Sequence, residues 1–359
     1  MVLKSKDRWS LFPAAMGLFL LVAMGTGLAA PSWALPLNSD PPGSPVRLVF
    51  IHHSVGQDWL TDVIGNLIGE LNDNNYYVTD TNYGWGPEAQ DLGWGNIGDH
   101  TDTGHWYNWF LGSRRDIYLP ELYDNLHLTP DVGANSIPRP DGPNTVIMFK
   151  SCYPNSGGIS GNPGDPPRQS SAENPNPLWG ADSGNQEANT VGNIKGLYRD
   201  LLQYFATRQD KLFILITPPP VTPGQQSVDG SSARARAINN WLVRHWLEGY
   251  PHNNVAVFDY FNVLTSNGGN PNTNDLGSAT GNHHRLRQAQ VEHVTGRNYN
   301  FTAYRSYDSH PTAAGHRKAA GEYAPLLNVV YHAWQGDGGR PWFMGRSPNS
   351  QPAQSLLLD

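Results

Sequence analysis

The chain has 359 residues, which is enough for one large domain or about two average ones. Its formal net charge of −7 and pI of about 6.0 provide no basic surface for nucleic acid and no preference for a particular ionic partner. Glycine (38) and proline (29) are abundant and only 15% of residues are charged, so the composition indicates long ordered loops rather than a helical bundle.

Residues 1–34 have the pattern of an export signal. A basic start is followed by an apolar stretch from about residue 14 to residue 30 and by a small-x-small cleavage pattern at residues 32–34. The alternative is a membrane anchor, but the apolar stretch is short and interrupted by glycines, which favours cleavage. We therefore expect a secreted, extracellular or periplasmic protein without stable membrane insertion. Cys152 is the only cysteine, so no internal disulfide is possible.

A Pro-rich lead-in at residues 35–45 precedes the main domain, which we expect over residues 46–335, and residues 336–359 read as a loosely ordered tail. Short apolar runs predict buried strands, and apolar residues at helical spacing predict helices between or after them. The predicted strands are residues 46–51, 76–82, 145–149, 212–217 and 255–260. The predicted helices cover residues 60–71, 194–205, 238–242 and 313–331, with a weaker one at 120–126.

Strands that alternate with helices predict an α/β fold with a parallel sheet and helices on both faces. Five strands suit a flavodoxin-like three-layer sandwich, in which ligands bind at the carboxyl ends of the strands. Long loops are expected at residues 84–116, 156–189 and 265–302. The tryptophans of the first loop suit either a small satellite core or a flat platform for sugar rings.

Chemically competent residues follow the predicted strands. Ser54 comes directly after the first strand, Asn155 follows the third, and Asp308 and His310 lie just before the last helix. The carboxyl ends of parallel strands share one edge of a sheet, so we expect these side chains to converge there. A serine, a histidine, an aspartate and an amide are the parts of an acyl-transfer site.

The expected roles follow from the chemistry of acyl transfer. A serine hydroxyl needs a base to take its proton, which assigns Ser54 as nucleophile and His310 as base. Asp308 would orient the imidazole. The oxyanion needs donors, and the candidates are the Ser54 backbone N–H, the Gly86 N–H (less favoured, Gly84) and the Asn155 amide.

Four sequence blocks resemble the SGNH (GDSL-like) hydrolases, esterases and lipases with a flavodoxin-like fold. RLVFIHHSVG resembles the nucleophile block, TDTNYGWG the glycine block, VIMFKSCYPNS the asparagine block and DSHPTAAGHRKAAG the Asp-His block. The resemblance spans about residues 46–332 and implies the same roles for Ser54, Gly86, Asn155 and His310. No cofactor or metal is implied.

The sequence departs from this family's pattern at three places. His52 and His53 stand where the family usually has Gly-Asp before the serine, and the asparagine block lacks the common Gly-x-Asn-Asp form. The usual Asp-x-x-His is Asp-x-His, with Tyr307 at the usual Asp position, so a backbone carbonyl is an alternative to Asp308 as orienting group. Related Asp-x-His sites occur in acetyl-transferring relatives, which keeps acyl transfer open.

Each candidate residue also has a plain structural explanation. Ser54 suits a helix N-cap, and Gly86 and Asn155 suit turns. One of His52 and His53 is expected in the core and the other beside the site. The loop from Asp99 to His105 lacks a recognised metal spacing, and Cys152 reads as a small buried residue.

Together these features predict a secreted serine esterase that acts on a small-molecule or polysaccharide ester, with an O-acetylated carbohydrate as first choice and a lipid ester as second. The alternatives are an acyltransferase with the same site and a non-catalytic carbohydrate-binding or surface protein on the same fold.

Overall fold

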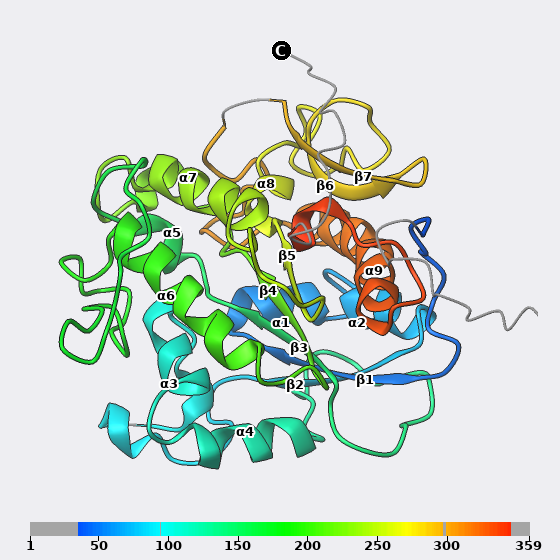
Figure 1. Ribbon diagram of the computed structural model, residues 1–359. Helices are drawn as coiled ribbons and strands as arrows, with labels where there is room; N and C mark the ends of the chain where they lie inside the picture. The colour runs from blue at the N-terminus through cyan, green and yellow to red at the C-terminus, as the bar shows by residue number, and fades with distance from the viewer. Residues whose placement is uncertain (1–34, 94, 297–298, 346–359) are drawn as a thin grey trace, which may run out of the picture. The chain divides into compact units, whose positions relative to one another are not determined.

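The computed structural model describes residues 35–93, 95–296 and 299–345 (Figure 1). Its central sheet is entirely parallel and has the strand order β2-β1-β3-β4-β5. This is the flavodoxin-like order, so the predicted α/β fold class is confirmed. The strands are β1 (Val46–Ile51), β2 (Tyr76–Thr81), β3 (Val146–Lys150), β4 (Leu212–Ile216) and β5 (Val255–Phe258).

The strands form where the sequence has short apolar runs because the sheet is covered on both faces. Residues of β3, β4 and β5 are buried along their whole length, and β1 is buried after Val46. A parallel sheet buried on both faces has continuous rather than alternating apolar strands. The predicted strand bounds therefore agree with the structure to within two residues.

The helices form two layers. α1, α2 and α9 pack against one another on one face, and α3, α4, α6 and α7 cover the other face (Figure 1). The short α5 and α8 follow the ends of β3 and β5. The helices are α1 (Ser54–Leu60), α2 (Leu67–Asp73), α3 (Trp106–Phe110), α4 (Arg115–Asp124), α5 (Pro154–Gly157), α6 (Val191–Phe205), α7 (Ser231–Arg244), α8 (Tyr260–Val263) and α9 (Ala313–Gln335).

The helix predicted over residues 60–71 is wrong as a single element. α1 ends at Leu60 because Thr61 has an extended ψ of 128°, and α2 begins only after Asn66, which has a left-handed φ of 55°. The apolar residues before and after this turn still face the same layer, which is why their spacing imitates one helix.

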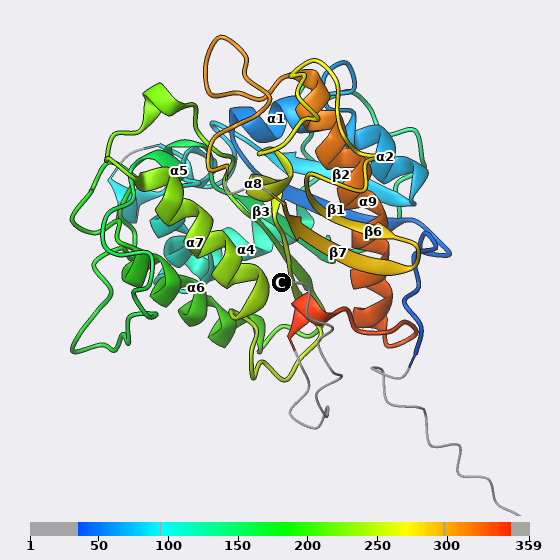
Figure 2. The same ribbon diagram turned by 90° about the horizontal axis from the view of Figure 1, so that it is seen from above.

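The stretch at residues 265–302, expected to be irregular, contains an antiparallel hairpin. β6 (Asn282–Arg287) and β7 (Gln290–Thr295) are joined by a turn in which Gln288 and Ala289 have φ of 50° and 58°. The hairpin lies beside α9 (Figure 2). Its buried side chains include His283 and His284 rather than apolar residues, so no apolar alternation revealed it.

The described part of the tail is packed, which corrects the prediction of loose order for residues 336–345. Phe343 and Met344 are buried beside β5, and the Gly339 N–H donates to the carbonyl of Pro36 in the lead-in. The rest of the tail and the predicted export signal lie outside the described residues. Among the described residues, none of the helices has the length and apolar character needed to cross a membrane.

Trp59 of α1 ties the layers together. Its ring lies 6.0 Å from the Phe258 ring of β5, 4.7 Å from the Tyr260 ring of α8 and 5.5 Å from the Tyr323 ring of α9. It is fully buried. The position of α1, and hence of Ser54 at its start, therefore depends on this aromatic cluster.

We predict that Trp59→Ala lowers the free energy of unfolding by about 3–5 kcal/mol, because the buried indole leaves a cavity that the sheet cannot fill. Urea denaturation measures this change. Val63→Ala is the control: Val63 is 73% exposed, and its loss should cost no more than about 0.5 kcal/mol. Equal values for both variants would contradict the role assigned to Trp59.

Candidate active site

Ser54 sits where the first strand passes into the first helix. β1 ends at Ile51, His53 has an extended backbone (φ −122°, ψ −161°), and Ser54 is the first residue of α1. α1 passes close to the end of the strand because residue 56 is a glycine, whose added Cβ would lie 2.3 Å from the Cβ of His52. The Ser54 side chain is thereby presented at the carboxyl edge of the sheet.

The structure brings together the three residues predicted to do acyl chemistry. Ser54 Oγ lies 2.8 Å from His310 Nε2, although the two residues are 256 positions apart in the chain. On the other side of the ring, His310 Nδ1 lies 3.0 Å from Asp308 Oδ2. With Nδ1–H donating to the carboxylate, Nε2 is the acceptor for the serine hydroxyl, as a general base requires.

Asp308 holds the backbone of His310 as well as its ring. Asp308 Oδ1 accepts the His310 N–H at 2.7 Å and the Ser306 hydroxyl at 3.0 Å. Burial alone would raise the pKa of Asp308, but these hydrogen bonds from His310 and Ser306 hold it below its usual value. The carboxylate therefore stays ionised, and the carbonyl alternative is not needed to orient the ring.

Tyr83 is a site residue that the sequence analysis missed. Burial raises the pKa of the Tyr83 hydroxyl, whereas the hydroxyl and backbone N–H of Ser54 lower it, so the phenol belongs to the surroundings of the serine. Its ring stacks on His53 at a centroid distance of 3.9 Å. Its place directly after β2, in the glycine block, is the signal that would have identified it.

The two glycines of the same loop differ in what their N–H groups do. The Gly84 N–H donates to Asp99 Oδ1 at 2.7 Å, so it is engaged in the loop. Gly86 has a φ of 84°, and among the described residues its N–H has no hydrogen-bond partner. The assignment of Gly86 as oxyanion donor stays a prediction, and Gly84 is the weaker candidate.

The Asn155 amide is already occupied. Its Nδ2 donates to Asp102 Oδ1 at 2.8 Å and to the Cys152 carbonyl at 3.4 Å, and its Oδ1 accepts the Thr103 N–H at 2.8 Å. Within the described residues no hydrogen bond joins it to Ser54. An oxyanion role, which stays a prediction, would require the longer of the two donated bonds to be exchanged for the substrate.

His52 is the histidine that points into the core. It is fully buried, with Nδ1 2.9 Å from the His53 carbonyl oxygen and Nε2 3.0 Å from Asp80 Oδ2. Burial would raise the pKa of Asp80, but hydrogen bonds from His52 and Thr129 lower it. This buried pair therefore fixes the end of β1 to β2, next to the serine.

His53 lies beside the site. Its Nε2–H donates to the Gly98 carbonyl at 2.8 Å, and its ring stacks against the ring of Tyr83. Burial lowers its pKa to about 4, so the ring is neutral near pH 7. His53 therefore acts as an uncharged support for Tyr83 rather than as a second base for Ser54.

Two further residues lie under the serine. Cys152 is buried, as predicted, and its Sγ is 3.9 Å from Ser54 Oγ. Lys150, the last residue of β3, is fully buried and donates to the Ser151 carbonyl at 3.2 Å. In the described part of the chain no carboxylate lies within 4 Å of its ammonium group, and burial lowers its pKa.

The loop that carries the tryptophans packs into the fold. Trp106 and Trp109 are fully buried, and the indole N–H of Trp106 donates to Ser151 Oγ at 3.0 Å. Asp102 accepts from Asn155 and, at 2.6 Å, from the Ser183 N–H. Of the two explanations for this loop, these side chains fit a satellite core. Among the described residues, no group of three His, Cys, Asp or Glu side chains is placed to hold a metal ion.

No protein-family model matches the chain, and neither a curated protein nor a solved structure matches it. The resemblance to SGNH hydrolases thus rests on the four sequence blocks and on the contacts that their residues make.

We predict that His53 makes stability depend on pH between about 6.5 and 4. In this window the unfolded chain binds a proton that folded His53 does not, so the free energy of unfolding falls as pH falls. His53→Asn should reduce this slope by up to about 1.4 kcal/mol per pH unit, as urea denaturation at several pH values would show. His127→Asn, at an exposed position, is the control. An unchanged slope in His53→Asn would refute a neutral His53.

Proposed function

We propose that this protein is a secreted serine esterase of the SGNH type. The observation that carries the proposal is the unbroken hydrogen-bond chain from Ser54 Oγ through the His310 ring to Asp308, with distances of 2.8 Å and 3.0 Å. A serine with an oriented base is the minimum set for nucleophilic acyl transfer.

In the first step Ser54 Oγ attacks the ester carbonyl as its proton passes to His310 Nε2. The imidazolium that forms is stabilised by Asp308, whose hydrogen bonds lower its pKa and so keep it ionised. The Oγ–C bond forms and the carbonyl π electrons move to oxygen. When the tetrahedral intermediate collapses, His310 returns the proton to the leaving alcohol and an acyl-serine remains.

The developing oxyanion needs donors that are in position before the reaction. The Ser54 N–H is one, and the Tyr83 hydroxyl, whose pKa is influenced by Ser54, is a nearby side-chain candidate. Tyr83 is 60% exposed, so it can move aside or donate its own hydroxyl hydrogen. Gly86 remains the second backbone candidate, and each such donor lowers the barrier by about 3–4 kcal/mol in known enzymes.

Water then attacks the acyl-serine with His310 as base, and the products are a carboxylic acid and free Ser54. An acyltransferase would use an alcohol in place of water at this step. A carbohydrate ester remains the favoured substrate because of the predicted export signal. The binding-protein alternative requires no alignment of Ser54, His310 and Asp308, so their hydrogen bonds favour the enzyme.

We predict that Ser54→Ala lowers kcat for hydrolysis of p-nitrophenyl acetate by about 10³–10⁶-fold, because it removes the hydroxyl that His310 activates. Release of p-nitrophenol measures the rate, and circular dichroism checks the fold. Ser171→Ala, on an exposed loop, is the matched control. Equal rates for wild type and Ser54→Ala would remove Ser54 as nucleophile. Addition of a sugar acceptor, with analysis of the acylated product, separates transferase from hydrolase.

We also predict that Asp308→Asn lowers kcat by about 10²–10⁴-fold with little change in KM. An asparagine Nδ2 group cannot accept the His310 Nδ1–H, so the wrong tautomer faces the serine. Asp141→Asn, at an exposed position, controls for loss of charge. Wild-type activity in Asp308→Asn would show that another group orients the ring.

A further inference from the structure

A cleft of about 880 Å³ is lined by described residues on the two sides of the β6–β7 hairpin, within residues 265–281 before it and within 294–296 and 299–305 after it. Its volume is within the roughly 300–1,000 Å³ typical of ligand pockets. None of its lining residues belongs to the Ser54–His310–Asp308 chain. The cleft is therefore a separate feature of the segment that connects β5 to the catalytic loop.

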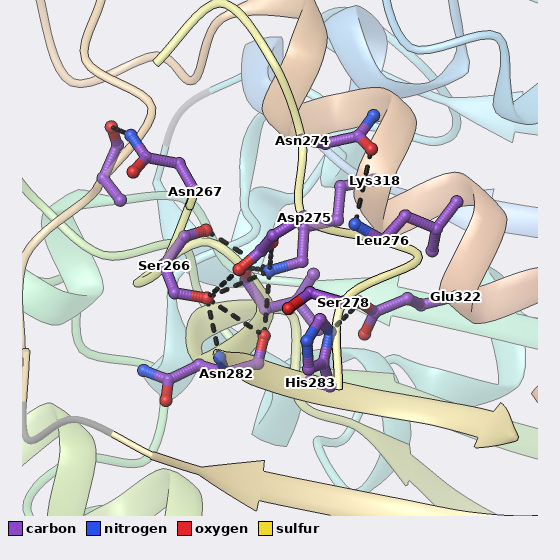
Figure 3. Close-up of polar contacts among 12 residues, drawn as sticks. Ser266, Asn267, Asn274, Asp275, Leu276, Ser278, Asn282, His283, Lys318 and Glu322 are labelled. Carbon is purple, nitrogen blue, oxygen red and sulfur yellow. Dashed lines mark hydrogen bonds and ion pairs between the residues drawn. The ribbon is translucent and has the colours of Figure 1, made fainter. Parts of the chain in front are cut away.

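The floor of the cleft is a buried ion pair. Lys318 reaches from α9 to Asp275 Oδ1 at 2.5 Å and donates to the carbonyls of Val263 and Asn282 at 2.8 and 2.9 Å (Figure 3). Asp275 Oδ2 also accepts the Ser266 hydroxyl at 2.8 Å. Burial would raise the pKa of Asp275, but Lys318 lowers it, so the carboxylate under the cleft is ionised.

Two features show that this floor is rigidly constructed. Gly281 has a φ of 113°, and a Cβ there would lie 2.4 Å from Asp275 Oδ2, so only glycine lets the chain pass the carboxylate. The Asn267 amide donates to the Ala303 carbonyl at 2.6 Å and links the two walls. The two walls of the cleft are therefore fixed to each other and to its floor.

The rim provides hydroxyl, guanidinium and aromatic groups. The Tyr299 ring is 36% exposed, and its hydroxyl accepts from Arg305 Nη2 at 2.8 Å, which leaves the phenolic hydrogen free to donate. The Ser278 and Thr280 hydroxyls lie 3.2 Å apart on the opposite segment. The lining combines these polar groups with apolar surface, to which Val294 and Ala303 contribute. A sugar ring, with hydroxyls at its edge and apolar C–H faces, suits such a mixed lining.

The cleft is joined directly to the catalytic loop. Arg305, on the rim, forms a backbone bridge with Pro311, the residue after His310. The Thr312 hydroxyl donates to the Pro271 carbonyl at 2.7 Å, which ties the start of α9 to the other wall. A ligand in the cleft is thereby adjacent to the segment that presents His310.

We propose that this cleft binds the alcohol part of the ester substrate as a neutral carbohydrate chain, with Tyr299 stacking on a sugar ring and the rim groups bonding its hydroxyls. The inference rests on the proposed esterase function, because it takes the ligand of this cleft to be part of the ester that Ser54 attacks. In this proposal the segment between β5 and Asp308 selects the alcohol of the ester, and the region around Ser54 binds the acyl group.

The test compares two substrates in the full-length protein. Tyr299→Ala and Arg305→Ala should raise KM for acetylated xylo-oligosaccharides by about tenfold, because each loses one direct contact. Both variants should hydrolyse p-nitrophenyl acetate within about twofold of wild type. Tyr307→Ala is the matched control, since Tyr307 is 99% exposed on the same loop and does not line the cleft.

Binding without turnover separates this proposal from the proposed function. Calorimetric titration of Ser54→Ala with xylohexaose, cellohexaose and chitohexaose should detect binding of at least one sugar, and Tyr299→Ala in the same background should weaken that binding.

If a sugar binds through Tyr299 but the wild type hydrolyses no ester, the cleft proposal stands and the esterase proposal fails. If p-nitrophenyl acetate is hydrolysed but none of the sugars binds, or if Tyr307→Ala weakens binding as much as Tyr299→Ala, the cleft proposal is overturned. Binding of inorganic phosphate in place of the sugars would overturn it as well.

Discussion

A single carboxylate decides where the imidazole of this protein can be. Asp308 accepts the backbone N–H of His310 with one oxygen, at 2.7 Å, and the ring Nδ1–H with the other, at 3.0 Å. Asp308 can bond the backbone of His310 with one oxygen and its ring with the other because only Ser309 separates the two residues. The segment therefore forms a tight turn. The shortened Asp-x-His spacing, which departs from the family's pattern, thus provides both the acid and the shape of the loop. The Ser306 hydroxyl oxygen lies inside this turn, 3.0 Å from Asp308 Oδ1 and 2.6 Å from the His310 carbonyl oxygen.

The edge of the sheet beneath Ser54 is unusually rich in buried ionisable groups. His52 and Asp80 compensate each other at 3.0 Å, whereas Lys150 has only a backbone carbonyl as a partner in the part of the chain that the structure describes. An isolated buried charge is costly, and burial accordingly lowers the pKa of Lys150. His52 and His53, which stand where SGNH hydrolases usually have Gly-Asp, have separate tasks. His52 joins two strands, and His53 supports Tyr83.

The strands and the long helices were predictable because burial leaves recognisable apolar patterns in the sequence. The proximity of Ser54, Asp308 and His310 was predictable because each follows or precedes an element at the same edge of the sheet. Elements without an apolar signature were not predictable. The β6–β7 hairpin buries His283 and His284, which pair with groups far away in sequence: His283 with Glu322 at 2.7 Å. The engagement of Asn155 by Asp102 and the approach of Tyr83 to Ser54 depend on loop paths that residue spacing does not encode. Packing of Phe343 against β5 is a tertiary contact of the same kind.

The segment between β5 and Asp308 has two structural consequences at once. Its hydrogen bonds hold the catalytic loop, through Pro271 to Thr312, and its walls form the cleft, through Asp275 to Lys318. Both attachments end on α9, whose start follows His310 directly. Changes on the inner face of α9 would therefore disturb the cleft and the imidazole together, whereas changes at the exposed rim, at Tyr299 or Arg305, leave the buried floor intact. If the cleft binds the alcohol as proposed, the rim can vary for a new alcohol without moving the His310 ring beside Ser54.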